Sequence, residues 1–201
     1  MRHQVLRELK GLRVLVVHPP DEEGRSLVDH LRRIGCQVEA MWPVPETCGR
    51  FDVIMLTIEH ESREAVTAFL KGFGTLPPAI VSMVSFEDPS TLQIVLETGS
   101  LAVVERPVRP FGLLTNLIIA RSLWLDQAET RKRIAKLERK LDGIQNIQKA
   151  KSLLMHSQGL NETAAYEMIR KQAMSKRVAM EEIATAIINA HDLLNIGPKH
   201  G

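Results

Sequence analysis

Five short apolar runs recur along the first half of the chain, and they constrain its fold more than any other feature. They lie at residues 13–17, 37–40, 53–56, 79–84 and 101–104. Most are apolar at consecutive positions, so both faces of such a strand must be buried, as in a parallel sheet with helices on both sides. The run at residues 37–40 alternates only weakly between polar and apolar positions.

Apolar residues at helical spacing separate these runs. The stripes lie at residues 27–34, 65–70 and 92–96, and a further helix begins at about Phe111. A glycine follows each of the first three stripes, at the position where a helix commonly ends. We interpret the alternation as five strands and five helices, which form a (βα)5 doubly wound parallel sheet. A ligand of such a sheet is expected at the carboxyl ends of the strands.

The stretches at residues 51–56 and 78–81, the order of the elements and a basic residue before Pro107 carry a family resemblance. Across residues 11–122 the chain resembles the receiver domain of bacterial response regulators. The resemblance implies a receiver-like domain, which we assign to residues 1–122.

Four positions that carry the chemistry of a receiver differ in this chain. The resemblance places the metal-binding acid pair at His18 and Pro19, the phosphate-accepting aspartate at Thr57 and the phosphate-pairing lysine at Arg106. Phosphoryl transfer to a carboxylate needs a nucleophilic oxygen and a magnesium ion held by carboxylates, and imidazole is a poor ligand for that ion. We therefore expect a pseudo-receiver with no metal, no cofactor and no phosphorylation.

Structural roles are expected for the side chains at these positions. His18 and Thr57 fill the former pocket or cap its loops. Arg106 pairs with a neighbouring carboxylate, Glu105 or Glu59, rather than with phosphate.

A long helix follows the predicted sheet. From Phe111 the chain reads as helix for about 45 residues without a proline, which exceeds the usual length in globular domains. Apolar residues at alternating three- and four-residue steps indicate a coiled-coil seam. We expect this helix to hold a homodimer through Trp124, Ile134, Leu137, Leu141 and Ile144.

Three shorter helical segments complete the chain. The first continues to Gly159, Asn161 caps the second, and the polar residues 175–177 precede the third. Each is too short to be stable alone, so the three must share a core. We assign residues 123–142 to a coiled-coil linker helix and residues 143–201 to a three-helix domain, so that the chain is α/β and then all-α.

The last helices carry a second family resemblance. It rests on the string from Ala150 to Met155 and on the Gly159–Leu160 and Ala173–Met174 pairs, in order and at the family spacing. This segment resembles the ANTAR domain, the RNA-binding output module of the AmiR/NasR transcription antiterminators. A receiver without its aspartate, joined by a coiled coil to ANTAR, is similar to the AmiR branch in particular.

Charge is unevenly distributed along the chain. Residues 1–130 carry 13 Lys and Arg against 17 Asp and Glu, and residues 131–201 carry 13 against 7. The basic excess of the second segment favours a polyanionic partner, with a solvated helix surface as the alternative. The predicted RNA contacts are Gln148, Lys149, Lys151, Arg170, Lys171, Ser175, Lys176 and Arg177.

Two residues of this segment have a competing structural interpretation. Lys151 can pair with Glu162 or Glu167 inside the bundle instead of contacting RNA. Tyr166 adjoins an apolar stripe, so we expect it to be buried.

The ANTAR resemblance implies a dimer that binds hairpin loops in nascent mRNA leaders and prevents a terminator from forming. The AmiR resemblance implies control by a ligand-sensing negative regulator protein of periplasmic-binding-protein-like fold. Two other classes stay open, namely a DNA-binding response regulator with a helix-turn-helix and a scaffold that binds only proteins. The sequence has no glycine-rich phosphate loop and no metal-spaced set of His and Cys, so we expect no enzymatic activity.

The sequence also favours a cytoplasmic location. No apolar run approaches the ~18 residues of a membrane helix, and the basic first residues have no apolar core behind them. Two cysteines do not make a disulfide framework. We therefore expect a cytoplasmic protein without a membrane partner.

Overall fold

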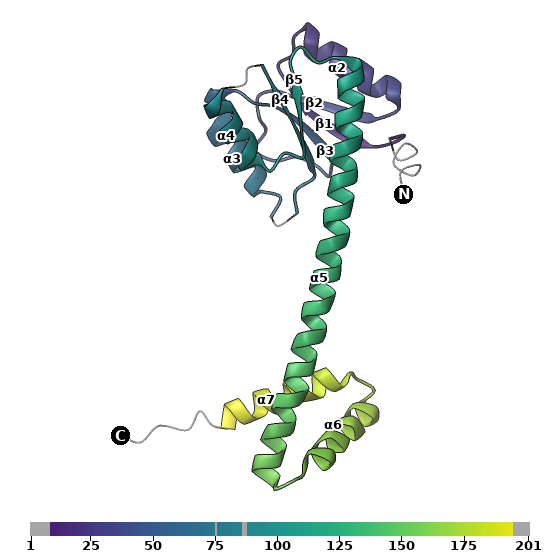
Figure 1. The fold of residues 1–201 in the computed structure, drawn as a ribbon, viewed down its shortest axis with the longest axis vertical. Helices are drawn as coiled ribbons and strands as arrows, with labels where there is room; N and C mark the ends of the chain where they lie inside the picture. Colours follow the sequence, from purple (N-terminus) through teal and green to yellow (C-terminus); the bar gives the residue numbers. More distant parts are fainter. Residues whose placement is uncertain (1–8, 75, 86–87, 195–201) are drawn as a thin grey trace, which may run out of the picture. The chain divides into compact units, whose positions relative to one another are not determined.

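The chain divides into two compact units, Met1–Thr130 and Arg131–Gly201 (Figure 1). We describe each unit by itself, from a computed structural model that describes residues 9–74, 76–85 and 88–194. In this part of the chain no helix is both long enough and apolar enough to cross a membrane.

Unit 1 is built on a five-stranded, fully parallel sheet. Its strands are β1 (Arg13–Val17), β2 (Gln37–Met41), β3 (Val53–Thr57), β4 (Ala79–Val84) and β5 (Ala102–Glu105). The spatial order is β2-β1-β3-β4-β5. The order reverses between β1 and β3, which is the switch point where ligands of doubly wound sheets bind. The predicted parallel sheet is confirmed.

Helices cover both faces of this sheet. Helices α2 (Glu22–Ile34) and α5 (Pro110–Gln158) pack on one face, and α3 (Arg63–Lys71) and α4 (Pro89–Thr98) on the other (Figure 1). A short 3-10 turn, η1 (His60–Ser62), precedes α3. Successive strand residues point to opposite faces, so the side chains of each inner strand alternate between two separate apolar cores.

The prediction of five helices in this unit was wrong at one point. The segment at residues 42–52, between β2 and β3, contains no helix. Pro43 and Pro45 lack the backbone N–H that a helix interior needs. The loop contributes Val44, Cys48 and Phe51 to the edge of one core instead.

Helix α2 brings its first turn close to the end of β1. Asp21 caps the helix, because its Oδ1 accepts a hydrogen bond of 2.7 Å from the backbone N–H of Gly24. A Cβ atom at Gly24 would lie 2.5 Å from the carbonyl oxygen of Pro19 and 2.8 Å from Nδ1 of His18. Glycine at this position therefore permits the close approach of the helix to the strand end.

Unit 2 consists of the last part of α5 together with α6 (Glu162–Lys176) and α7 (Met180–Leu194). The core of the unit consists of Ala150, Leu154, Ala165, Ile169, Ala173, Ile183, Ala184 and Ile188. As predicted, Asn161 caps α6, with its Oδ1 accepting from the N–H of Ala164 at 2.8 Å. Alanines at the contacts let the helix backbones approach closely. Because α5, α6 and α7 share this core, the predicted bundle of three helices is confirmed.

Helix α5 runs unbroken from Pro110 to Gln158. The predicted domain boundaries at residues 122/123 and 142/143 both lie inside it, where no break in the backbone marks them. They stay predictions.

Candidate functional site

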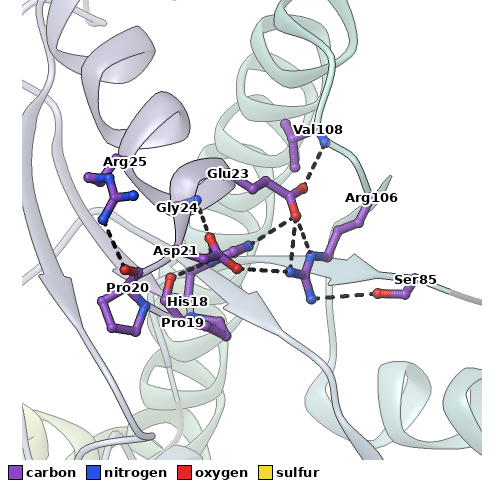
Figure 2. A network of polar contacts seen from close by, with 10 residues as sticks. All are labelled: His18, Pro19, Pro20, Asp21, Glu23, Gly24, Arg25, Ser85, Arg106 and Val108. Atoms are coloured by element: carbon purple, nitrogen blue, oxygen red, sulfur yellow. Dashed lines mark hydrogen bonds and ion pairs between the residues drawn. The ribbon is translucent and has the colours of Figure 1, made fainter.

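A network of polar side chains lies at the carboxyl ends of β1 and β5 in unit 1 (Figure 2). His18 follows β1, Arg106 follows β5, and Asp21 and Glu23 belong to the start of α2. The consecutive elements β1 and α2 thus meet the end of β5, which is distant in sequence, and bring one imidazole, two carboxylates and one guanidinium together.

His18 is buried, with its side chain only 1% exposed. Its Nδ1 lies 2.9 Å from the carbonyl oxygen of Pro19. Because a carbonyl oxygen only accepts hydrogen bonds, Nδ1 must carry the proton of this contact. The other ring nitrogen, Nε2, has no hydrogen-bond partner and lies 3.7 Å from Oε2 of Glu23.

Arg106 and Glu23 form the closest ion pair of this network. Nε and Nη2 of Arg106 donate to Oε2 of Glu23 at 3.1 and 3.0 Å. The other carboxylate oxygen of Glu23 accepts from the backbone N–H of Val108 at 2.9 Å. Glu23 therefore ties the first turn of α2 to the segment between β5 and α5, which includes the cis Arg106–Pro107 bond.

Both carboxyl groups of the network are held in their charged forms. Burial raises the pKa of Glu23, but the Val108 N–H and the Arg106 guanidinium outweigh it, and the pKa lies below its ordinary value. The pKa of Asp21 is also lowered, mainly by the hydrogen bond from the Gly24 N–H and further by His18 and Arg106.

The partner of Arg106 differs from the prediction. Sequence reasoning paired it with Glu105 or Glu59, whereas the structure pairs it with Glu23 and places Asp21 3.9 Å away. Glu23 was missed because it precedes Arg106 by 83 residues. The available signal was an acidic residue in the first turn of the helix that follows β1, a turn that packs beside the strand ends.

The residues at this edge do not fit the magnesium and phosphate chemistry of a receiver. Thr57 ends β3 with a fully buried side chain whose Oγ1 has no hydrogen-bond partner, so a hydroxyl stands where a carboxylate is needed. Pro19 offers only its backbone carbonyl, which His18 contacts. The Arg106 guanidinium lies on the carboxylate of Glu23, where it neutralises negative charge that a hard cation would require.

A second candidate site is the basic surface of unit 2. Of the residues predicted to contact RNA, seven are exposed: Gln148 and Lys149 on α5, Arg170, Lys171, Ser175 and Lys176 on α6, and Arg177 directly after it. Arg170 forms a surface ion pair with Glu167 at 3.2 Å. Arg170, Lys171 and Ser175 also line a shallow hollow along the outer side of α6.

Lys151 is placed differently from the other predicted contacts. It is buried, and its Nζ lies 2.6 Å from Oε1 of Glu162, so it joins α5 to the start of α6. The hydrogen bond from Lys151 lowers the pKa of Glu162. We therefore assign Lys151 to the packing of the bundle, the alternative that the sequence had left open.

Tyr166 contradicts the expectation of burial, because 40% of the residue is exposed. The buried stripe of α6 consists of Ala165, Ile169 and Ala173, and Tyr166 lies beside it. Met174 is also largely exposed on this helix. The surface of α6 thus combines cations with apolar and aromatic groups.

The predicted coiled-coil seam is exposed in the single chain. Ile134, Leu137, Leu141 and Ile144 are 49% to 65% exposed. Trp124 does not share this environment. Its Nε1 donates to the carbonyl oxygen of Pro77 at 2.7 Å, and its ring packs against the core of unit 1.

Comparison with known proteins assigns each unit separately. The family model described as "AmiR, N-terminal" matches residues 12–121, and the model of the ANTAR domain matches residues 135–188. The chain belongs to the AmiR family of ANTAR regulators. Both resemblances stated from the sequence are confirmed.

Among the relatives of this AmiR-family protein is the aliphatic amidase regulator of Pseudomonas aeruginosa. The two are 30% identical over 187 residues, which cover 92% of this chain and 95% of that protein. The nitrate regulatory protein of Klebsiella oxytoca is 41% identical over 66 residues, 33% of this chain and 17% of its own length. These relatives are named as regulators and not as enzymes.

Solved structures support the receiver-like fold of this AmiR-family protein. The response regulator StyR has a TM-score of 0.54 at 17% identity, covering 90% of this chain and 99% of that one. A CheY-like receiver domain from Methanospirillum hungatei has a TM-score of 0.52 at 17% identity, covering 59% of this chain and 99% of its own. At this level of identity the likeness shows the fold alone.

Proposed function

We propose that this protein is an RNA-binding transcription antitermination regulator. In this proposal a dimer binds hairpin loops in a nascent mRNA leader and prevents a terminator from forming. The observation that carries it is the match of residues 135–188 to the ANTAR domain, on a unit whose surface presents exposed basic residues. The nitrate regulatory protein and the aliphatic amidase regulator are named for regulation, which agrees with this role.

The chemistry of the α6 surface suits RNA loops. Loops display unstacked bases beside a dense row of phosphates, and proteins bind them with cations and planar side chains. Arg170, Lys171 and Lys176 supply cations, and Tyr166 supplies an exposed ring on the same helix. The proposed contacts are Gln148, Lys149, Arg170, Lys171, Ser175, Lys176 and Arg177.

Dimerisation is the second part of the proposal. Ile134, Leu137, Leu141 and Ile144 follow the three- and four-residue steps of a coiled coil and are exposed in the single chain. A second copy of the same helix would cover these side chains and remove their apolar surface from water.

Control by a partner protein is the third part. Thr57 offers no carboxylate to phosphorylate, and Arg106 already pairs with Glu23 inside the unit. We propose that a ligand-sensing negative regulator protein holds the dimer inactive and releases it when an inducer binds. Incubation with acetyl phosphate tests this part, and phosphate on unit 1 would contradict it.

Gel-shift titrations test the RNA-binding part. The full chain is titrated with a leader RNA that contains tandem hairpins and with the matching duplex DNA at equal salt. We expect the RNA to bind more tightly, and a Lys171→Gln/Lys176→Gln variant to bind it less tightly than the wild type. The control variant is Lys71→Gln, which removes an exposed cation from unit 1.

Two other outcomes of these titrations would each identify a different class of protein. Preference for the duplex would identify a DNA-binding response regulator. Indifference to both nucleic acids by a folded dimer would identify a scaffold that binds proteins only.

A further inference from the structure

The polar network of unit 1 contains three side chains of the kinds that bind metal ions. One ligand atom from each of His18, Asp21 and Glu23 lies within 4.8 Å of the other two. We propose that this cluster binds a divalent transition-metal ion of the zinc class, in place of the magnesium of a receiver and in contrast to the expectation of no metal drawn from the sequence. The inference is independent of RNA binding, because it concerns only residues of unit 1.

The orientation of His18 is the first argument. Its Nδ1 donates to the Pro19 carbonyl, so in the neutral ring the lone pair of Nε2 is directed into the buried network. There it lies 3.7 Å from a carboxylate oxygen of Glu23, with no hydrogen bond between the two atoms. A metal cation placed between them would bond to both. Metal-binding histidines commonly donate their second ring N–H to a backbone carbonyl in this manner.

The spacing of the ligand atoms is the second argument. Two ligands bonded to a tetrahedral zinc ion at ~2.0 Å lie about 3.3 Å apart. The separation of 3.7 Å between Nε2 of His18 and Oε2 of Glu23 needs only a small adjustment to reach this value. Gly24 permits this arrangement, because a Cβ atom there would lie 2.8 Å from Nδ1 of His18.

The type of ligand selects the metal. Magnesium requires oxygen ligands and keeps most of its waters, whereas imidazole together with carboxylates suits zinc, cobalt and nickel. The cluster supplies one buried nitrogen and two carboxylates, and Asp21 is accessible to solvent, which leaves room for a water as a further ligand.

Arg106 competes with the metal ion for Glu23. Its guanidinium donates twice to the same oxygen, Oε2, that faces His18. A bound ion would draw this oxygen away from Arg106, whose Nη1 lies 3.5 Å from the hydroxyl of Ser85. Removal of the guanidinium charge should therefore strengthen metal binding.

Titration with Co²⁺ tests the proposal on the full chain after chelator treatment, with the visible absorption of Co²⁺ and calorimetry as readouts. The wild type should bind one Co²⁺ at this site, which Zn²⁺ displaces and Mg²⁺ does not. Glu23→Gln should weaken binding by at least about tenfold, the loss typical of removing even an outer partner of a metal ligand. Arg106→Gln should tighten binding, and the neighbouring Glu22→Gln should leave it unchanged.

Two results would overturn the proposal. One is the absence of Co²⁺ binding by both the wild type and Arg106→Gln, which does not depend on a variant that loses a ligand. The other is binding that persists unchanged in Glu23→Gln and His18→Gln, since the ion would then lie at other histidines or cysteines. Circular dichroism of each variant verifies that it is folded.

Discussion

At the scale of single residues, two lysines two positions apart on α5 have opposite environments. Lys149 is exposed, whereas Lys151 is buried and bonded to Glu162. A helix turns about 100° per residue, so side chains two positions apart point in very different directions. Charge alone therefore does not identify the residues that can contact a polyanion.

The two lysines give a matched pair of variants. Lys149→Gln should weaken binding of leader RNA and lower the slope of log affinity against log salt by about 0.7, the contribution of one phosphate contact on a single strand. Lys151→Met should leave both quantities unchanged, because Met retains the buried stem. Fluorescence anisotropy at several salt concentrations measures them. An effect of Lys151→Met as large as that of Lys149→Gln would refute the assignment of Lys151 to packing.

The ionisation of Glu23 predicts how the stability of the fold depends on pH. Its folded-state pKa is lowered, so the carboxylate stabilises the fold above its ordinary pKa of 4.5, and this contribution is lost as the pH falls through the folded value. Glu23→Gln should lower the free energy of unfolding at pH 7 by about 1.5–3 kcal/mol, the range for hydrogen bonds to charged groups. Denaturant unfolding should show this difference shrinking below pH 4.5, with Glu22→Gln as the control. A difference that stays constant with pH would contradict this role.

At the scale of elements, local signals predicted most of the fold. The apolar strands, the glycine after α2 and the Asn161 cap are encoded within a few residues of where they act. The absence of a helix at residues 42–52 was overlooked because the alternation of the other elements suggested one.

The candidate site was less predictable than the fold. The Arg106–Glu23 pair depends on the packing of the first turn of α2 beside the segment that follows β5, which the sequence does not display locally. Trp124 lies in a different environment from the other four predicted dimer contacts, because α5 packs against the sheet in unit 1 and is exposed further on.

The first turn of α2 gives a prediction about packing. Alanine normally stabilises a helix interior relative to glycine by about 1 kcal/mol. Gly24→Ala should instead destabilise unit 1 by about 1–3 kcal/mol, the usual cost of overpacking, because the new Cβ would overlap the Pro19 carbonyl. Gly112→Ala is the matched control, since a Cβ there meets nothing within 4 Å. Thermal unfolding of both variants checks this, and stabilisation by Gly24→Ala would refute it.

At the scale of the whole molecule, one continuous helix supplies residues to both units. Helix α5 contributes to the core of unit 1, presents the exposed coiled-coil seam (Ile134, Leu137, Leu141 and Ile144) and then contributes to the core of unit 2. The proposed dimer depends on this seam alone.

Disruption of the coiled-coil seam should therefore separate the two copies of the chain without unfolding either unit. Leu137→Glu should convert the dimer to a monomer in sedimentation velocity and weaken RNA binding, while near-native helicity is retained. Ala135→Glu adds the same charge at an exposed position outside the coiled-coil seam, and this variant should remain dimeric. A dimer that survives Leu137→Glu would indicate that another surface joins the copies.

The position of Trp124 in the core of unit 1 has a practical consequence. Both tryptophans, Trp42 and Trp124, belong to unit 1, and the one tyrosine of the chain, Tyr166, belongs to unit 2. Light that excites indole but not phenol will therefore report the melting of the pseudo-receiver alone, through an intrinsic fluorophore that requires no labelling. Ellipticity records both units, so a comparison of the two signals will reveal whether they melt together or in sequence.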